Sequence, residues 1–465
     1  MLKPYKEYRY FGLPWLEEVP SHWAMLRNKN VLIEKKEVVG SSANNYLLLS
    51  LTLNGVIARD MINAKGKFPK DFNTYKVVEP GNLIFCLFDI DETPRTVGLS
   101  TLNGMITGAY DVFQPVNING KYLYYYYLSI DNVKGLKPLY TGLRKVINIQ
   151  TFLGTKLPVP PKEEQDQIVR FLDWKLAKIN KLIRAKKKQI ALLNEQKQVI
   201  INNAVTKGLD PNAPMKDSGI EWINTIPISW KKDKVTRLFN IIGSGTTPSS
   251  GDSIYYENAT TPWINSGDLY SESMYLFKTD RAVSKRAIND YSVLKIYPSN
   301  TIVIAMYGAS IGNLAITKIP ACCNQACCCL SAIDQRLEVE YAYYLLKACK
   351  SFWIEKSKGG GQPNISQDII KQTWLPLPPK TEQIRISQYL SKYESYFHRT
   401  IETIQREINL IQEYRTRLIS DVVTGKVDVR DIEIPEYEAD SDETIDDEID
   451  DNLVLDEEDG EMEVE

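Results

Sequence analysis

The nine residues LPVPPKEEQ at positions 157–165 occur again as LPLPPKTEQ at positions 375–383. Seven of the nine positions are identical across a shift of 218 residues, so we interpret the pair as an internal duplication. Proline stiffens the backbone and ends a preceding strand, so each stretch is predicted to be a turn that leads into the next element. The architecture follows from what lies on either side of these two turns.

A second set of matches confirms that the duplication covers most of the chain. Four residues recur 207 positions later, namely Gly12, Trp15, Pro20 and Trp23 as Gly219, Trp222, Pro227 and Trp230. The 218-residue shift also relates Val205-Thr206 to Val423-Thr424, which gives the second copy an insertion of 11 residues. Because solenoid repeats are only about 20–50 residues long, two large copies predict a pseudo-symmetric molecule instead.

Each copy has the same predicted order of elements. Short apolar runs such as 82–88 and 301–306, separated by Gly and Pro, are typical of buried strands. After each proline turn a long helix is expected, over 162–206 and 380–424, each roughly 67 Å long. Apolar residues at steps of three and four run along both, including Ile168, Leu172, Ile179, Ile183 in the first and Ile386, Leu390, Tyr393, Phe397 in the second. This pattern favours an antiparallel coiled coil, although each helix could instead pack on its own domain.

The predicted fold class is therefore α+β, with two mixed α/β globular domains in a pseudo-two-fold repeat, separated by two long antiparallel coiled-coil helices. The predicted boundaries are a first domain over 1–161, a first spacer helix over 162–206, a linker over 207–218, a second domain over 219–379, a second spacer helix over 380–424 and an acidic, disordered tail over 425–465.

Composition narrows the class of protein. The 465 residues are 43% hydrophobic and 25% charged, which suits a packed core. We expect a cytoplasmic location because no charged-then-apolar leader opens the sequence. The two histidines, His22 and His398, weaken most histidine-based catalysis. Five of the seven cysteines crowd into 322–329, which is unlike a disulfide framework. Adjacent cysteines on a strand point to opposite faces, so we favour buried apolar side chains over a zinc site.

Charge is divided sharply along the chain. Residues 431–465 contain 19 Asp/Glu and no Lys/Arg, which leaves 40 acidic and 56 basic residues in 1–430, a net charge of +16. A solvated surface could carry this excess, but a polyanion such as nucleic acid explains it better. The acidic end has few aromatics and no helical period, so it is predicted to be disordered.

These features together resemble a known family. Two variable globular regions, each closed by a Leu-Pro-x-Pro-Pro-x-x-Glu-Gln turn and a long helix, resemble the specificity subunit of type I restriction–modification systems. The resemblance covers residues from about 12 to 428 and includes GTTPS at 245–249, Asn324-Gln325 and GGQPNIS at 360–366. The first copy departs from it, with TGLRKV at 141–146 where the second has GGGQPN at 359–364.

The resemblance implies a sequence-specific DNA-binding subunit without catalysis of its own. Each globular domain would recognise one half of a bipartite site, and two modification (methyltransferase) subunits and restriction (translocase/nuclease) subunits would bind the chain. AdoMet, ATP and Mg²⁺ would then belong to those partners, with no cofactor or metal in this chain and no membrane association. The sequence itself contains no adenine-methylating Asn-Pro-Pro-aromatic motif, no AdoMet loop and no phosphate-binding GxxxxGK[ST] motif.

The candidate DNA-binding residues fall into base readers, close-approach positions and phosphate contacts. Amide side chains can read adenine and arginine can read guanine, glycines let the backbone approach a phosphate, and lysines neutralise phosphates. The candidates are Lys65, Lys67, Lys70, Arg144, Lys145, Ser244, Gly245, Thr246, Thr247, Lys278, Lys285, Arg286, Asn324, Gln325, Gly360, Gly361, Gln362 and Asn364. For Asn324-Gln325, a structural role in capping buried backbone stays equally open. The glycine run could instead be a plain flexible loop, and the lysines could simply lie on solvated faces.

Two other functions stay open at this point. One is a stand-alone DNA-binding nuclease with duplicated recognition halves, although no Asp/Glu cluster stands in both copies. The other is a coiled-coil scaffold that does not bind DNA, which the positive body disfavours.

Overall fold

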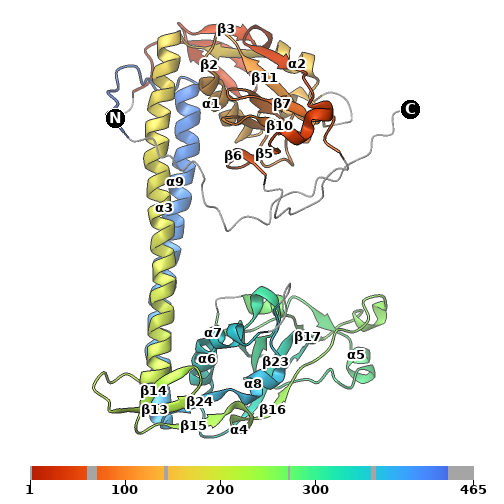
Figure 1. Ribbon diagram of the computed structural model, residues 1–465, viewed down its shortest axis with the longest axis vertical. Helices are drawn as coiled ribbons and strands as arrows, with labels where there is room; N and C mark the ends of the chain where they lie inside the picture. Colours follow the sequence, from red (N-terminus) through yellow and green to blue (C-terminus); the bar gives the residue numbers. More distant parts are fainter. Residues whose placement is uncertain (1–2, 60–70, 141–144, 271–272, 358–362, 438–465) are drawn as a thin grey trace. The chain divides into compact units, whose positions relative to one another are not determined.

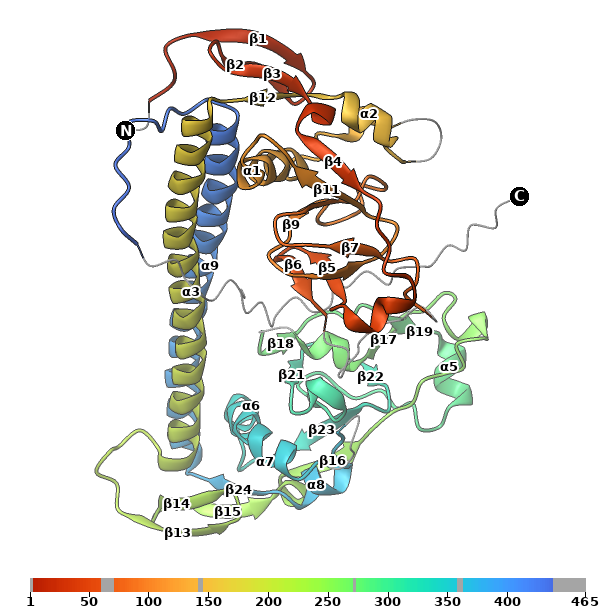
Figure 2. The same cartoon turned by 45° about the horizontal axis from the view of Figure 1, so that its top comes forward.

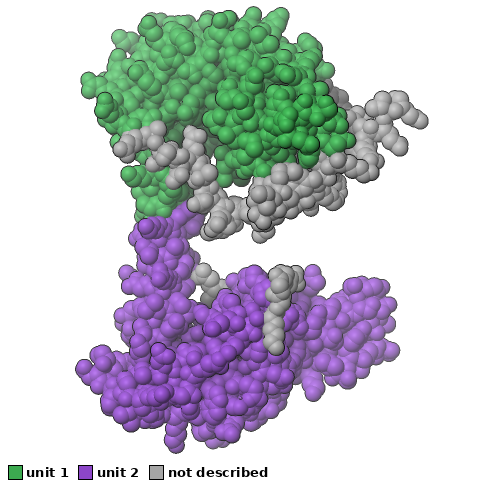
Figure 3. All heavy atoms as spheres, viewed as in Figure 1, with its two compact units in different colours: residues 1–186, 406–465 green, residues 187–405 purple. Residues whose placement is uncertain are grey.

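The computed structural model describes residues 3–59, 71–140, 145–270, 273–357 and 363–437. It divides into two compact units, unit 1 from residues 1–186 and 406–465 and unit 2 from residues 187–405 (Figure 3). Each unit thus combines one sheet-bearing domain with the adjoining parts of both long helices. No described helix is both long enough and apolar enough to cross a membrane.

Unit 1 is built around a four-stranded antiparallel sheet of strand order β4-β11-β8-β9. Its strand β11 is labelled in Figure 1. Its core is aromatic, since Phe85 packs against Phe113, Tyr127 and Phe152 with ring centroids 4.9–5.8 Å apart. The elements before the first long helix are β1(Tyr8–Leu13), β2(Leu16–Pro20), β3(Ala24–Arg27), η1(Asn28–Asn30), β4(Leu32–Lys35), η2(Gly40–Asn45), β5(Leu49–Thr52), β6(Gly55–Ala58), β7(Lys76–Val78), β8(Leu83–Phe85), β9(Val97–Leu99), β10(Gly104–Ile106), β11(Asp111–Pro115), α1(Gly120–Asp131), η3(Lys137–Leu139), α2(Ile149–Gly154) and β12(Lys156–Val159).

Unit 2 repeats this plan with the sheet β16-β23-β20-β21-β18, in which the added strand β18 is parallel to β21. A second, three-stranded sheet of order β19-β17-β22 belongs to the same unit. The elements are β13(Met215–Ile220), β14(Ile223–Pro227), β15(Lys231–Lys234), α4(Val235–Leu238), β16(Phe239–Gly243), η4(Ser253–Tyr255), β17(Thr261–Ile264), η5(Ser266–Tyr270), β18(Tyr275–Leu276), β19(Ala282–Val283), α5(Lys285–Asp290), β20(Ile302–Ala305), η6(Gly308–Ser310), β21(Leu314–Thr317), β22(Cys322–Cys323), β23(Cys327–Ile333), α6(Val339–Ala348), α7(Lys350–Glu355), α8(Gln367–Gln372) and β24(Trp374–Leu377).

The duplicated sequence motifs form the joint between each domain and its long helix. In unit 1 the Trp23 indole donates to the Glu164 carboxylate over 2.9 Å, and the Gln165 amide donates to the Pro160 carbonyl over 2.8 Å. The Gln165 side-chain oxygen also accepts from the Asn119 backbone at 2.8 Å, just before α1 begins. Unit 2 repeats the same contacts, at 3.1, 2.9 and 2.8 Å, through Trp230–Glu382, Gln383–Pro378 and Gln383–Glu338. The identical residues are therefore those that fix the start of each helix.

The long helices are α3(Lys162–Lys207) and α9(Lys380–Val423), which end within one residue of the predicted positions. Each unit holds the start of one helix and the end of the other, so the two run antiparallel within each unit (Figure 2). Each is followed by a glycine with φ of +78°, Gly208 and Gly425, a left-handed conformation that glycine adopts without strain. The predicted α+β class with paired antiparallel helices is confirmed.

Most of the predicted helix seam is buried, with one error. Ile168, Leu172, Ile386 and Leu390 are at most 1% exposed. Tyr393, however, is 38% exposed and packs beside Tyr389 with ring centroids 4.6 Å apart. A tyrosine can keep its hydroxyl in water, so Tyr393 can follow the spacing of the apolar seam residues without being buried as they are.

The segment predicted to be a tail begins with a packed stretch. Val429 is fully buried, and its carbonyl and that of Ile432 accept hydrogen bonds from the Gln167 amide at 3.0 and 2.8 Å. Asp428 forms an antiparallel bridge with Lys3. The prediction of disorder from residue 425 is therefore wrong for these residues, because backbone hydrogen bonds and one buried valine tie them to α3. Residues 438–465 lie outside the described part of the chain.

The cysteine-rich strands are buried on both faces. Cys327 and Cys329 pack in one apolar cluster and Cys328 in another, as the alternation of a strand requires. Burial raises the pKa of Cys322 and of Cys328 to about 12. These thiols are therefore neutral at physiological pH and act as small apolar side chains in the core.

Candidate nucleic-acid interface

At one side of the unit 2 sheet the strands β16 and β20 end, and the strand β23 between them begins. The end of β16 lies opposite β23 through the Gly243–Cys329 pair, and the end of β20 lies opposite the first residue of β23 through Ala305–Cys327. The loops after β16, before β23 and after β20 are therefore adjacent. We call Ser244–Thr247, Asn324–Gln325, Tyr307 and Asn364 the unit 2 edge.

Two motifs that lie about 80 positions apart in the sequence touch at this edge. The Thr247 hydroxyl donates to the Gln325 side-chain oxygen over 2.7 Å. The Ser244 hydroxyl lies 3.5 and 3.4 Å from the Asn324 and Gln325 carbonyl oxygens, and the Gly245 backbone N–H donates to the Asn324 carbonyl at 3.3 Å. Thr246 is half-buried between them. The structure thus brings these predicted residues into one surface.

Gly245 is required by a close approach of two backbones. A Cβ atom at this position would lie 1.7 Å from the carbonyl oxygen of Cys323, well inside contact distance. The sequence made Gly245 a candidate DNA-binding residue without a specific role. The structure shows that it makes room for the segment carrying Asn324.

The two amides of the Asn324-Gln325 pair have different surroundings. Both ends of the Asn324 side chain are used within the protein, since its oxygen accepts from the Ala326 N–H at 3.0 Å and its nitrogen donates to the Asn265 oxygen at 3.1 Å. Asn324 therefore has the structural role that the sequence left open. Gln325 is exposed, and among described residues its amide nitrogen has no hydrogen-bond acceptor. Gln325 is thus the amide of this pair that is open to solvent.

A fourth segment completes the unit 2 edge. Asn364, which is exposed, forms an antiparallel bridge with Tyr307, and the Met306 N–H donates to the Ala326 carbonyl at 2.8 Å. Tyr307 is 43% exposed, and neither it nor Asn265 was predicted. Asn265 follows β17 directly and Tyr307 follows β20 after one residue, and a polar residue just after an apolar strand is a signal that could have identified them. Gly360, Gly361 and Gln362 lie outside the described residues.

The three predicted phosphate contacts of unit 2 do not join this edge. Lys278 is exposed after β18, the strand at the opposite side of the sheet from β16. Lys285 and Arg286 lie exposed on α5, where Arg286 pairs with Asp290 at 2.6 Å. Exposed ion pairs of this kind are weak, so Arg286 can exchange its partner for a phosphate.

Unit 1 has an equivalent edge with different side chains. Its order β4-β11-β8 matches β16-β23-β20, and the bridge Phe88–Val146 matches Tyr307–Asn364. The Phe88 ring stacks on Tyr110 with centroids 6.1 Å apart, an aromatic pair that was not predicted. We call Phe88, Tyr110, Lys145 and Val146 the unit 1 edge. Lys65, Lys67, Lys70 and Arg144 lie outside the described residues.

Lys145 is held by carboxylates of its own unit. Its ammonium lies 3.4 Å from the Asp91 carboxylate and also pairs with Glu92. A hydrogen bond from the Tyr140 hydroxyl, with smaller contributions from Lys137 and Lys145, lowers the pKa of Asp91 to about 2. Lys145 must therefore leave these anions before it can contact a phosphate, which the sequence did not indicate.

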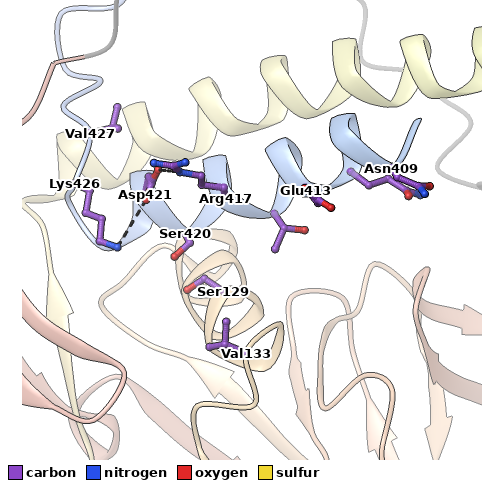
Figure 4. Close-up of a pocket in the computed structure, with 11 residues that line it drawn as sticks. Ser129, Val133, Asn409, Glu413, Arg417, Ser420, Asp421, Lys426 and Val427 are labelled. Atoms are coloured by element: carbon purple, nitrogen blue, oxygen red, sulfur yellow. Dashed lines mark hydrogen bonds and ion pairs between the residues drawn. The ribbon is translucent and has the colours of Figure 1, made fainter. Parts of the chain in front are cut away.

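Each unit also has a groove where its domain meets the end of a long helix. The unit 1 groove, of about 1040 Å³, lies between the end of α1 and the end of α9 (Figure 4). Its wall includes Asp421, which pairs with Arg417 at 3.3 Å and Lys426 at 3.8 Å. The unit 2 groove, of about 580 Å³, lies between α6, α7 and the end of α3. Ser129 and Ser420 of the first groove correspond in the repeat to Ala348 and Asn202 of the second.

Comparison with known proteins identifies the family. A family model described as "Type I restriction modification DNA specificity domain" matches residues 107–192 and 227–410, parts of both copies. The chain belongs to this family. Its fold and its DNA-specificity domains are thus those of a type I restriction–modification specificity subunit.

Curated relatives agree over parts of their length. The chain is 29% identical over 202 residues to the type I restriction enzyme MjaIX specificity subunit of Methanocaldococcus jannaschii, covering 43% of this chain and 45% of that one. It is 26% identical over 252 residues to the EcoR124I/EcoR124II specificity subunit of Escherichia coli, covering 50% and 60%. The match thus spans about half of the length of these relatives.

A solved structure supports the fold. A chain described under "Structural basis underlying complex assembly and conformational transition of the type I R-M system" aligns with a TM-score of 0.62. The alignment covers 88% of this chain and 99% of that chain at 15% sequence identity. At this identity the likeness concerns the fold alone.

Proposed function

We propose that this chain binds a bipartite DNA site, reads one half with each edge, and directs adenine methylation and restriction that partner subunits carry out. The observation that carries the proposal is that the two units share one strand order, whereas the loops at their equivalent edges carry different side chains. The unit 2 edge presents Thr247, Gln325 and Asn364, whereas the unit 1 edge presents Phe88, Lys145 and Val146. A shared framework with different loops fits the reading of two different half-sequences.

At the unit 2 edge Gln325 is the proposed base reader. Its side-chain oxygen is oriented by the Thr247 hydroxyl, which leaves the amide nitrogen directed away from that bond. Glutamine pairs with adenine through two hydrogen bonds in the major groove, and such a pair discriminates by about 1–3 kcal/mol. The exposed Lys278, Lys285 and Arg286 would contact phosphates, which position the protein without reading sequence.

The pair of grooves is the proposed docking surface for two copies of a modification subunit. Both grooves combine a domain helix with the end of a long helix, and the unit 2 groove is also lined by residues 221–225 around the turn between β13 and β14. Two equivalent surfaces on a pseudo-symmetric chain suit two copies of one partner. We further propose that AdoMet, ATP and Mg²⁺ bind the modification and restriction subunits, and that this chain contributes sequence recognition only.

The test is a methylome of cells that carry this chain with its modification subunit. We expect one bipartite methylated sequence, and we expect Gln325→Ala to relax one half of it while the other half stays unchanged. Gln325→Glu is the matched variant, since it keeps the shape of the side chain but removes the amide donor. Equal weakening on every DNA sequence would contradict base reading by Gln325, and methylation by this chain alone would contradict the division of labour.

A further inference from the structure

The first part of α3 carries a concentrated positive charge. Residues 175–186 contain five Lys/Arg and no Asp/Glu. Lys178 and Lys181 are exposed, and Leu182 beside them is 47% exposed. Lys175, Lys178, Lys181 and Leu182 follow at helical spacing, so they share one side of the helix. We call these four residues the basic face; the coiled-coil seam does not explain their charge.

Trp174 lies at the N-terminal end of the basic face, where two lysine side chains pack over its ring. The Lys175 and Lys178 ammonium groups lie 4.2 and 4.5 Å from the centre of the Trp174 ring. The Trp174 indole N–H is buried and has no hydrogen-bond partner in the described part of the chain. Two neighbouring cations repel each other, so an anion bound beside them would be stabilised.

The end of the chain leads to the same place. After α9, the segment passes Gln167, whose amide donates to the Val429 and Ile432 carbonyls. Gln167 and Lys178 are eleven residues, or about three turns, apart, so they lie on the same side of α3. The hydrogen bonds at Gln167 therefore bring the segment to the side of α3 that carries the basic face. Figure 2 shows the segment descending beside the first turns of α3.

The residues that come next have the complementary charge. Residues 438–465 contain 16 Asp/Glu and no Lys/Arg, and seven of these acids lie within 438–448. Lys181 lies 14 residues beyond Gln167, or about 21 Å along α3. An extended chain covers that distance in about six to seven residues, fewer than the 16 that separate Ile432 from residue 448. The segment is thus long enough, and begins in the right place, to line the whole basic face.

We propose that the acidic residues 438–448 bind the basic face of α3 and act as an internal competitor of nucleic acid for it. Each Lys–carboxylate pair is weak when exposed, so binding depends on several pairs formed at once. Such pairs are screened by salt, with a Debye length of about 8 Å at physiological ionic strength. Docking is therefore favoured at low salt and is displaced by a stronger polyanion. The competition with DNA rests on the proposed function, whereas the docking itself does not.

Carbodiimide cross-linking of the full-length protein, followed by mass spectrometry, tests the docking without DNA. This reagent joins amines only to carboxylates in direct contact. We expect intramolecular links from Lys178 and Lys181 to residues 438–448, lost at 1 M salt and in the Lys178→Gln/Lys181→Gln variant. Lys29, exposed on η1 of the same unit, is the control lysine. Links spread equally over Lys29 and the basic face, or links between molecules only, would overturn the proposal.

A DNA-binding titration tests the competition. The full-length chain is compared with a chain that ends at Tyr437, each with and without Lys178→Gln/Lys181→Gln, on a duplex that lacks the methylated site. If the acidic segment is bound nine tenths of the time, its removal raises affinity about tenfold. We expect this gain at low salt only, and not in the Gln variants. An equal gain in the Gln variants would place the competition elsewhere on the chain, and no gain would refute it. Failure of the proposed function would appear separately, as the lack of any bipartite methylated sequence.

Discussion

Glu164→Ala is expected to destabilise unit 1 considerably more than Glu382→Ala destabilises unit 2, although the two residues occupy the same position in the repeat. The Glu164 carboxylate is 5% exposed and accepts hydrogen bonds from the Tyr5 hydroxyl at 2.6 Å and the Trp23 indole at 2.9 Å, and it pairs with His22 at 2.8 Å. Glu382 is half-buried and accepts from Trp230 alone among the hydrogen bonds of the described residues.

The magnitude follows from the donors that each change leaves without an acceptor. Tyr5 and Trp23 are 4% and 1% exposed, so water cannot replace the lost carboxylate, whereas His22 is 38% exposed and can turn to water. A buried donor without a partner costs about 1–3 kcal/mol, so Glu164→Ala should cost about 3–5 kcal/mol and Glu382→Ala about 1–2 kcal/mol. For a domain of this size 1 kcal/mol corresponds to about 2–4 °C in Tm.

The assay is thermal unfolding combined with hydrogen exchange of peptides from each unit, so that the loss is assigned to the unit that carries the change. Both buried donors use the same oxygen, Oε1 of Glu164, and Glu164→Gln keeps that oxygen. The glutamine variant should therefore retain most of the stability. Equal Tm shifts for the two alanine variants, or a glutamine variant as unstable as Glu164→Ala, would refute the reasoning.

Three further predictions concern the edges and the long helices. Gly245→Ala places a Cβ atom 1.7 Å from the Cys323 carbonyl oxygen, so we expect loss of recognition of one half-site with the other half retained, as read in a methylome. Asn324→Ala should lower the Tm of unit 2 because it removes two internal hydrogen bonds. Gln325→Ala should leave the Tm unchanged and weaken binding to cognate DNA alone, by about 1–3 kcal/mol. A Tm loss for Gln325→Ala together with weaker DNA binding but an unchanged Tm for Asn324→Ala would contradict both assignments. Duplicating the heptad 183–189 preserves the seam register and lengthens α3 by about 10 Å. The DNA spacer between the two half-sites, as read in a methylome, should then widen by roughly three base pairs. Changed half-sequences with an unchanged spacer would show that the helix belongs to a reading domain.

The sequence by itself determined the duplicated plan of the molecule. The stretches 157–165 and 375–383 recur because each fixes the start of a long helix through its glutamate and glutamine. Such joints depend on residues that are close together in the chain or that recur as a set, so they leave a pattern that can be read directly. The helix limits were predictable for the same reason, since a seam and a proline turn are local features.

The tertiary structure alone decided which residues meet. Thr247 and Gln325 lie 78 positions apart, and only the pairing of β16 with β23 brings them into contact. Asn324 and Gln325 are neighbours in the sequence with the same chemistry, yet packing against Asn265 engages one amide and leaves the other exposed. The carboxylates around Lys145 and the docking of residues 427–432 on Gln167 were equally unpredictable. Each of these contacts depends on strand order and backbone approach, physical constraints that act across the folded chain and leave no period or motif along it.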